Sequence, residues 1–150
     1  MNNLSTTIAL NPDQVWGPTM VTLVYLLLYY AFMVNILFVK IRLVKRYKER
    51  GEKFDRYFSQ DPEMLAADRI QLNMLEHMAP FLILMWLHAL LVSSFEATVL
   101  GGIYTLSRLL YPFLVKNGIK RQIPMRILFS TVIGYLIIFI MTIRVFFKII

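Results

Sequence analysis

Uncharged apolar stretches and short charged segments alternate along this chain. No charged residue lies at positions 15–39, 78–95 or 127–143, and a fourth stretch, 97–115, is interrupted only by Arg108. A helix of about 20 apolar residues crosses the hydrocarbon core of a bilayer. The pattern therefore predicts four membrane-spanning helices, at about residues 17–42, 69–95, 98–116 and 126–146.

Proline and glycine mark where these helices are expected to begin and end. Residues 11–18 contain two prolines and a glycine, which predicts an entry turn, so that the first helix begins near Pro18. The Asp-Pro-Glu sequence at 61–63 is typical of a helix start, and the second helix is therefore expected to begin ahead of the bilayer. Gly118 indicates the end of the third helix, and Pro124 indicates the start of the fourth.

Composition supports a membrane protein and excludes several kinds of chemistry. Hydrophobic residues make up 58% of the chain, whereas a soluble domain has roughly 45–50% apolar residues. Residues 1–150 are filled by the four helices and their connections, which predicts a single domain, an all-α integral membrane four-helix bundle. Cysteine is absent, so any thiol chemistry must use a bound small molecule. His77 and His88 lack a third ligand at a zinc-like spacing, and we expect them to make interhelical hydrogen bonds rather than a metal site.

Positive charge is concentrated in the two longer loops. Four basic residues lie between positions 116 and 126, and nine lie between 40 and 69: Lys40, Arg42, Lys45, Arg46, Lys48, Arg50, Lys53, Arg56 and Arg69. An excess of Lys and Arg in short loops marks the cytoplasmic side of a membrane. Both loops are therefore expected to be cytoplasmic and both termini outside, in a bacterial inner membrane or the endoplasmic reticulum. The same distribution explains the net charge of +7 without a nucleic-acid partner.

Three polar residues near the start of the second predicted helix share one face. Arg69, Asn73 and Glu76 are spaced i, i+4 and i+7, which aligns them on a helix of about 3.6 residues per turn. Charged side chains in a membrane span are costly and indicate function. The arginine can bind the carboxylate of a zwitterionic ligand, and the glutamate its ammonium group. The alternative is an ion pair that only fixes helix packing.

A second polar stripe lies on the third predicted helix. Tyr104, Arg108 and Tyr111 repeat the same spacing. Because Arg108 lies in the middle of an apolar stretch, it must face protein or a water-filled cavity. The alternative to a ligand-binding role is a buried ion pair between Arg108 and Glu76, which would orient two helices without chemistry.

The sequence at 69–81 resembles the signature of the MAPEG family, the membrane-associated proteins in eicosanoid and glutathione metabolism. That signature is an arginine, then Asn-x-x-Glu, then an apolar stretch with a proline. The residues that carry the resemblance are Arg69, Asn73, Glu76 and Pro80. The Arg-Leu-Leu-Tyr sequence at 108–111 and the basic, proline-containing segment at 121–126 are similar to elements of family enzymes. The elements also follow in the same order, so the resemblance covers almost the whole chain.

The resemblance implies a homotrimer, with a site for glutathione between neighbouring subunits at the cytoplasmic side. Glutathione would be a co-substrate whose thiolate attacks an electrophilic lipid or reduces a hydroperoxide. The other implied partners are membrane lipids and a hydrophobic small-molecule substrate. The residues implied for its binding are Arg69, Asn73, Glu76, His77, Arg108 and Tyr111, with Arg42 or Lys40 from the adjacent subunit. Arg121 or Arg126 would be the catalytic residue at the sulfur, because an adjacent cation lowers the pKa of a thiol.

Val115 departs from the family pattern, since several family enzymes have a second tyrosine four residues after the position of Tyr111. The departure is compatible with a non-catalytic member that binds lipid or a partner protein in the same groove. The intact polar residues favour a glutathione-dependent transferase or peroxidase. A third hypothesis, a small proton-coupled exporter, needs a titratable carboxylate deep in a span, whereas Glu76 lies at the cytoplasmic edge.

Overall fold

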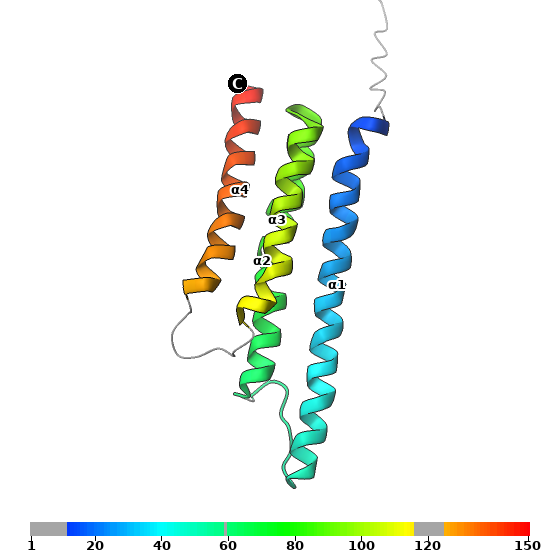
Figure 1. Ribbon diagram of the computed structural model, residues 1–150, viewed down its shortest axis with the longest axis vertical. Helices are drawn as coiled ribbons and strands as arrows, with labels where there is room; N and C mark the ends of the chain where they lie inside the picture. Colours follow the sequence, from blue (N-terminus) through cyan, green and yellow to red (C-terminus); the bar gives the residue numbers. More distant parts are fainter. Residues whose placement is uncertain (1–11, 59, 116–124) are drawn as a thin grey trace, which may run out of the picture.

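The computed structural model describes residues 12–58, 60–115 and 125–150 of the chain. In these ranges it consists of four helices and no strand (Figure 1). The helices are α1 (Pro12–Glu49), α2 (Pro62–Leu91), α3 (Ser94–Val115) and α4 (Met125–Ile149). Each is long and apolar enough to cross a membrane. The prediction of an all-α membrane four-helix bundle is therefore confirmed.

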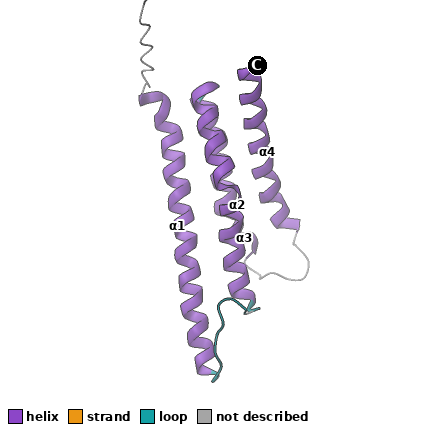
Figure 2. Ribbon diagram, turned by 180° about the vertical axis from the view of Figure 1, so that it is seen from behind, coloured by secondary structure: helices purple, strands orange, loops and turns teal. Residues whose placement is uncertain are grey.

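The two central helices, α2 and α3, separate α1 from α4. Within the described residues α1 packs on α2 and α3, α4 packs on the same two helices, and α1 makes no contact with α4. Figures 1 and 2 show this arrangement from opposite sides, with α1 extending beyond its neighbours at its C-terminal end. Gly51, whose φ of 74° favours glycine, follows the end of α1 as the usual helix-terminating residue.

Several helix boundaries differ from those predicted by a few residues. The prediction of an entry turn before Pro18 is wrong, because α1 already begins at Pro12 and continues through Pro18. A proline inside a helix leaves the carbonyl four residues earlier without its N–H donor. Here that carbonyl belongs to Gln14, and the Ser94 hydroxyl at the start of α3 donates a hydrogen bond to it. The second helix ends at Leu91, a few residues before the predicted end.

Three aromatic rings make up the centre of the core. Phe81 of α2 stacks on Tyr104 of α3 with ring centroids 3.9 Å apart, and Tyr25 of α1 lies 5.0 Å from Phe81. All three side chains are fully buried. The Tyr25 hydroxyl donates to the Met74 carbonyl at 2.9 Å, which satisfies a polar group that would be costly to bury alone. The rings therefore fix α1, α2 and α3 against one another in the membrane.

Polar contacts tie the helices together at the end of the bundle remote from the basic loops. The fully buried His88 of α2 lies 3.2 Å from the Glu96 carboxylate at the start of α3. Both carboxylate oxygens of Glu96 also lie 2.7 Å from Arg144 of α4. The expectation that His88 makes an interhelical hydrogen bond is confirmed.

Candidate functional site

The polar stripe of α2 begins two turns into the helix. Asp61 caps α2 by accepting the Glu63 N–H at 2.9 Å, a contact that satisfies one of the free donors at a helix start. Because α2 is continuous from Pro62, Arg69, Asn73 and Glu76 follow one another along one side, as predicted. Arg69 and Glu76 are exposed in the single subunit, and Asn73 is half-buried. The stripe therefore presents two charges at the surface of a membrane-spanning helix.

Arg108 of α3 lies under this stripe and is almost completely buried, with 1% of its surface exposed. Its Nη1 donates a hydrogen bond to the Asn73 side-chain oxygen. The guanidinium carbon lies 4.7 Å from the centroid of the Tyr104 ring, a distance that allows a cation–π interaction. The sequence also allowed a buried ion pair between Arg108 and Glu76. Within the described residues Arg108 is hydrogen-bonded to Asn73 and makes no ion pair with Glu76.

Gly134 of α4 provides the space for the Arg108 guanidinium. A β-carbon built on Gly134 would collide with Nη2 of Arg108 and lie 3.0 Å from its guanidinium carbon. Any larger residue at position 134 would therefore displace the arginine. Nη2 and Nε of Arg108 are buried and have no hydrogen-bond partner among the described residues. Gly134 was not among the site residues predicted from the sequence, although a glycine inside an apolar helix is an indication of close packing.

Tyr111 brings the two stripes together one turn after Arg108. Its side chain is buried with Ile70 and Val115, and Arg69 of α2 is among its charged neighbours. Val115 therefore places an apolar side chain at the position four residues after Tyr111, where the family pattern described above has a second tyrosine. We call Arg69, Asn73, Glu76, Arg108 and Tyr111 the polar cluster: it joins cations, an amide, a carboxylate and a phenol on α2 and α3.

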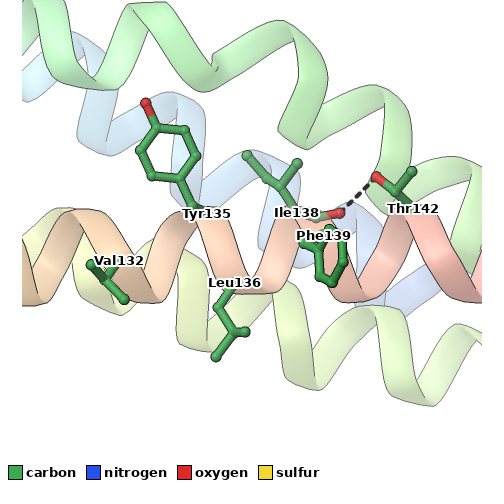
Figure 3. Close-up of a pocket in the computed structure, with 6 residues that line it drawn as sticks. All are labelled: Val132, Tyr135, Leu136, Ile138, Phe139 and Thr142. Carbon is green, nitrogen blue, oxygen red and sulfur yellow. Dashed lines mark hydrogen bonds between the residues drawn. The ribbon is translucent and has the colours of Figure 1, made fainter.

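His77 contacts α4 rather than the polar cluster. Its ring packs edge-on against Tyr135, with centroids 4.8 Å apart and an interplanar angle of 82°. Tyr135 points toward α2 from α4 and borders an open, mainly apolar hollow of about 560 Å³ (Figure 3). The other residues lining it are Val132, Leu136, Ile138, Phe139 and Thr142. The hydroxyl of Thr142 is bonded to the Ile138 carbonyl at 2.8 Å, so the hollow offers few polar groups.

The remaining predicted residues lie apart from the polar cluster or outside the described residues. Arg42 pairs with Glu63 at 3.0 Å, and Lys40 is exposed. Neither makes a hydrogen bond or ion pair to the cluster within the described part of the subunit. Arg121 lies outside the described residues. Arg126 belongs to the first turn of α4, and its side chain also lies outside what the structure describes.

The comparisons with known proteins agree with the arrangement of helices and polar residues. The model of the MAPEG family matches residues 19–147, which include most of α1 and α4, all of α2 and α3, and the whole polar cluster. No curated protein matches the chain.

Proposed function

Because the chain belongs to the MAPEG family, we propose that it is a glutathione-dependent transferase or peroxidase in a membrane. Its second substrates would be hydrophobic electrophiles or lipid hydroperoxides. The observation that carries this proposal is the polar cluster, since exposed and buried charges inside membrane spans are costly and are retained for function. A protein that binds only lipid has no need of them.

The polar cluster suits a zwitterionic peptide such as glutathione. Arg69 is free of ion pairs within the described residues and can bind a ligand carboxylate. Glu76 is likewise unpaired there and can accept the ligand ammonium group. The Asn73 oxygen already accepts a hydrogen bond from Arg108, which leaves the amide N–H groups of Asn73 to donate to the ligand. Tyr111 adds a phenol beside Arg69.

A second subunit would complete the site. Arg69 and Glu76 are exposed on α2 together with Leu72, Leu75 and Ile83, and a lipid-facing pair of charges is unfavourable. We propose a homotrimer in which a neighbouring subunit covers this face and supplies Arg42 or Lys40 to the ligand carboxylates. Native mass spectrometry from mild detergent is expected to give three subunits. A stable monomer with full glutathione affinity would contradict the shared site.

The chemistry requires a cation at the sulfur. A free thiol has a pKa of about 8.5, and a neighbouring cation lowers it. We propose that Arg121 or Arg126 has this role, so that the thiolate forms at neutral pH and attacks the second substrate. An apolar co-substrate can lie in the hollow on α4, beside His77.

Replacing Arg126 or Arg121 by alanine is expected to separate binding from chemistry. Affinity for glutathione should change little, but the pKa of the bound thiol should rise, so the thiolate fraction at neutral pH and the turnover should both fall. The activity profile should then move toward alkaline pH. Thiolate absorbance at about 240 nm, measured against pH with bound glutathione, reports the pKa directly.

The non-catalytic alternative is favoured by Val115, which occupies the tyrosine position of several family enzymes. Two results together would support this alternative: the parent protein binds glutathione without ionising its thiol, and neither arginine variant shifts the pKa of that thiol. In that case the same groove would bind lipid or a partner protein.

For the orientation in the membrane, we propose that the two basic loops are cytoplasmic and that both termini lie outside. The support is the concentration of Lys and Arg between positions 40 and 69 and between 116 and 126, the pattern that marks the cytoplasmic side. The membrane would be a bacterial inner membrane or the endoplasmic reticulum.

A further inference from the structure

The loop between α1 and α2 contains a turn that holds two adjacent aromatic side chains away from the protein. The Asp55 carboxylate accepts the backbone N–H groups of Tyr57 and Phe58 at 2.8 and 3.1 Å. Tyr57 is 88% exposed and Phe58 83% exposed. Among the large hydrophobic side chains of the described residues, Tyr57 is the most exposed. Two neighbouring aromatic rings in water are unfavourable, so their exposure indicates a partner.

The turn is fixed to both helices. Arg56 makes two hydrogen bonds to the Asp68 carboxylate of α2, at 2.9 and 2.7 Å. On the other side, the half-buried Phe54 packs edge-on against Tyr47 of α1, with ring centroids 5.3 Å apart. A paired arrangement of arginine and carboxylate is geometrically specific. The aromatic side chains of the turn are therefore presented from a supported position rather than from a loose loop.

Contacts between α1 and α2 give the depth of this turn. The Gln71 amide reaches the Met33 sulfur at 2.6 Å, and Arg42 pairs with Glu63 at 3.0 Å. Because Asp68 lies between Gln71 and Glu63 on the antiparallel α2, it is opposite the part of α1 between Met33 and Arg42. The loop thus returns from the far end of α1 to the level of that segment, as Figure 1 shows.

This level coincides with the end of the apolar part of α1. The uncharged stretch of α1 ends at position 39, and Lys40 follows. Tyrosine and other aromatic residues are enriched at the depth where hydrocarbon gives way to headgroups. A phenol and a phenyl ring held at this depth are suited to the interfacial region of the bilayer.

The charges around the turn complement an anionic lipid surface. Asp55, Glu63 and Asp68 are all engaged in contacts within the loop and its flanking helices. Between residues 45 and 53, at the end of α1 and in the following loop, four cationic side chains have no ion pair in the described structure, whereas only two acidic side chains there are unpaired. The cations are Lys45, Lys48, Arg50 and Lys53; the acids are Glu49 and Glu52. Basic residues beside a membrane attract anionic headgroups.

We propose that the turn at residues 55–58 is an interfacial anchor: Tyr57 and Phe58 insert among the headgroups of an anionic phospholipid surface, and the unpaired Lys and Arg residues bind the headgroup charges. The ion pair from Arg56 ends on Asp68, directly before Arg69 of the polar cluster. The anchor therefore also holds α2 at a fixed depth through its second turn, at Asp68. This inference does not depend on the ligand of the cluster.

The test uses Tyr57→Trp as a fluorescent probe in a full chain whose own tryptophans are replaced by Trp16→Phe and Trp86→Phe. The protein is reconstituted into bilayers of phosphatidylcholine, alone or with about one part in four of phosphatidylglycerol. Lipids brominated near the headgroup are expected to quench the new indole more than lipids brominated near the chain end. Aqueous acrylamide should quench it weakly, and more weakly still in the anionic bilayer, with a shift of emission to shorter wavelength.

Glu52→Trp in the same background is the matched control, since Glu52 is exposed in the same loop and is expected to be quenched by acrylamide in both bilayers. Arg56→Ala, which releases the turn from α2, should reduce quenching of the Tyr57→Trp probe by the shallow bromolipid. Acrylamide quenching equal to that of the control would overturn the anchor. So would an indole protected from both quenchers in detergent and in either bilayer, because that result means protein covers the turn, as a second copy would.

Discussion

Replacing Glu76 by alanine is expected to weaken glutathione binding by roughly 10- to 150-fold, the loss of about 1.5–3 kcal/mol that accompanies removal of a charge-assisted hydrogen bond. Glu76 is exposed at the surface of the polar cluster and has no ion pair within the described residues. Its carboxylate is therefore available to the ligand ammonium group rather than to the protein. Because this contact is made before and during the reaction alike, turnover at saturating glutathione should fall much less than affinity.

Isothermal titration calorimetry with the reconstituted protein measures the affinity, and steady-state kinetics measure the turnover. Glu52→Ala is the matched control, because it removes an exposed, unpaired carboxylate from the loop outside the cluster. Glu76→Gln should give an intermediate affinity, since the amide oxygen still accepts a hydrogen bond but carries no charge. Unchanged affinity in Glu76→Ala, with the parent protein binding glutathione, would remove Glu76 from the site.

Gly134→Ala is expected to lower the stability of the bundle and the affinity for glutathione together. The added methyl group would collide with the Arg108 guanidinium, which is buried, bonded to Asn73 and placed over the Tyr104 ring. Overpacking of this kind costs about 1–3 kcal/mol. If the guanidinium moves, Asn73 loses its hydrogen bond and with it the orientation of its amide toward the ligand. Thermal unfolding in detergent and calorimetry with glutathione measure the two effects.

Gly102→Ala gives the opposite expectation and serves as the control. A β-carbon at Gly102 meets no atom within 4 Å, and alanine is favoured over glycine inside a helix by roughly 0.5–1 kcal/mol. Its stability should therefore be unchanged or slightly higher, with normal glutathione affinity.

A double-mutant cycle tests whether Arg108 is the group displaced. Arg108→Lys removes the planar guanidinium whose Nη2 and carbon lie closest to the added methyl group, so Gly134→Ala should be less harmful in that background. Residues in contact show coupling of about 0.5–3 kcal/mol. Additive effects on stability would mean that the cost of Gly134→Ala arises elsewhere in the helix.

Much of the candidate site follows from spacing alone. Arg69, Asn73 and Glu76 share a face because α2 is continuous, and the helical period then fixes their relative directions. The same reasoning aligned Arg108 with Tyr111 on α3. The prediction that the first helix begins at Pro18 was wrong. The hydroxyl of Ser94, 80 residues away, donates a hydrogen bond to the Gln14 carbonyl and replaces the N–H that Pro18 lacks. No local rule at residues 11–18 contains that contact.

The class of protein, the four spans and the residues of each polar stripe could be predicted from the sequence, because apolar length and helical period are properties of one segment at a time. The partner of each polar group could not, because it depends on how the helices pack. Arg108 bonds to Asn73 and not to Glu76, and Gly134 is the residue that admits its guanidinium. These pairings depend on the rotation and register of α2, α3 and α4, which are set by how rings and glycines pack across the bundle.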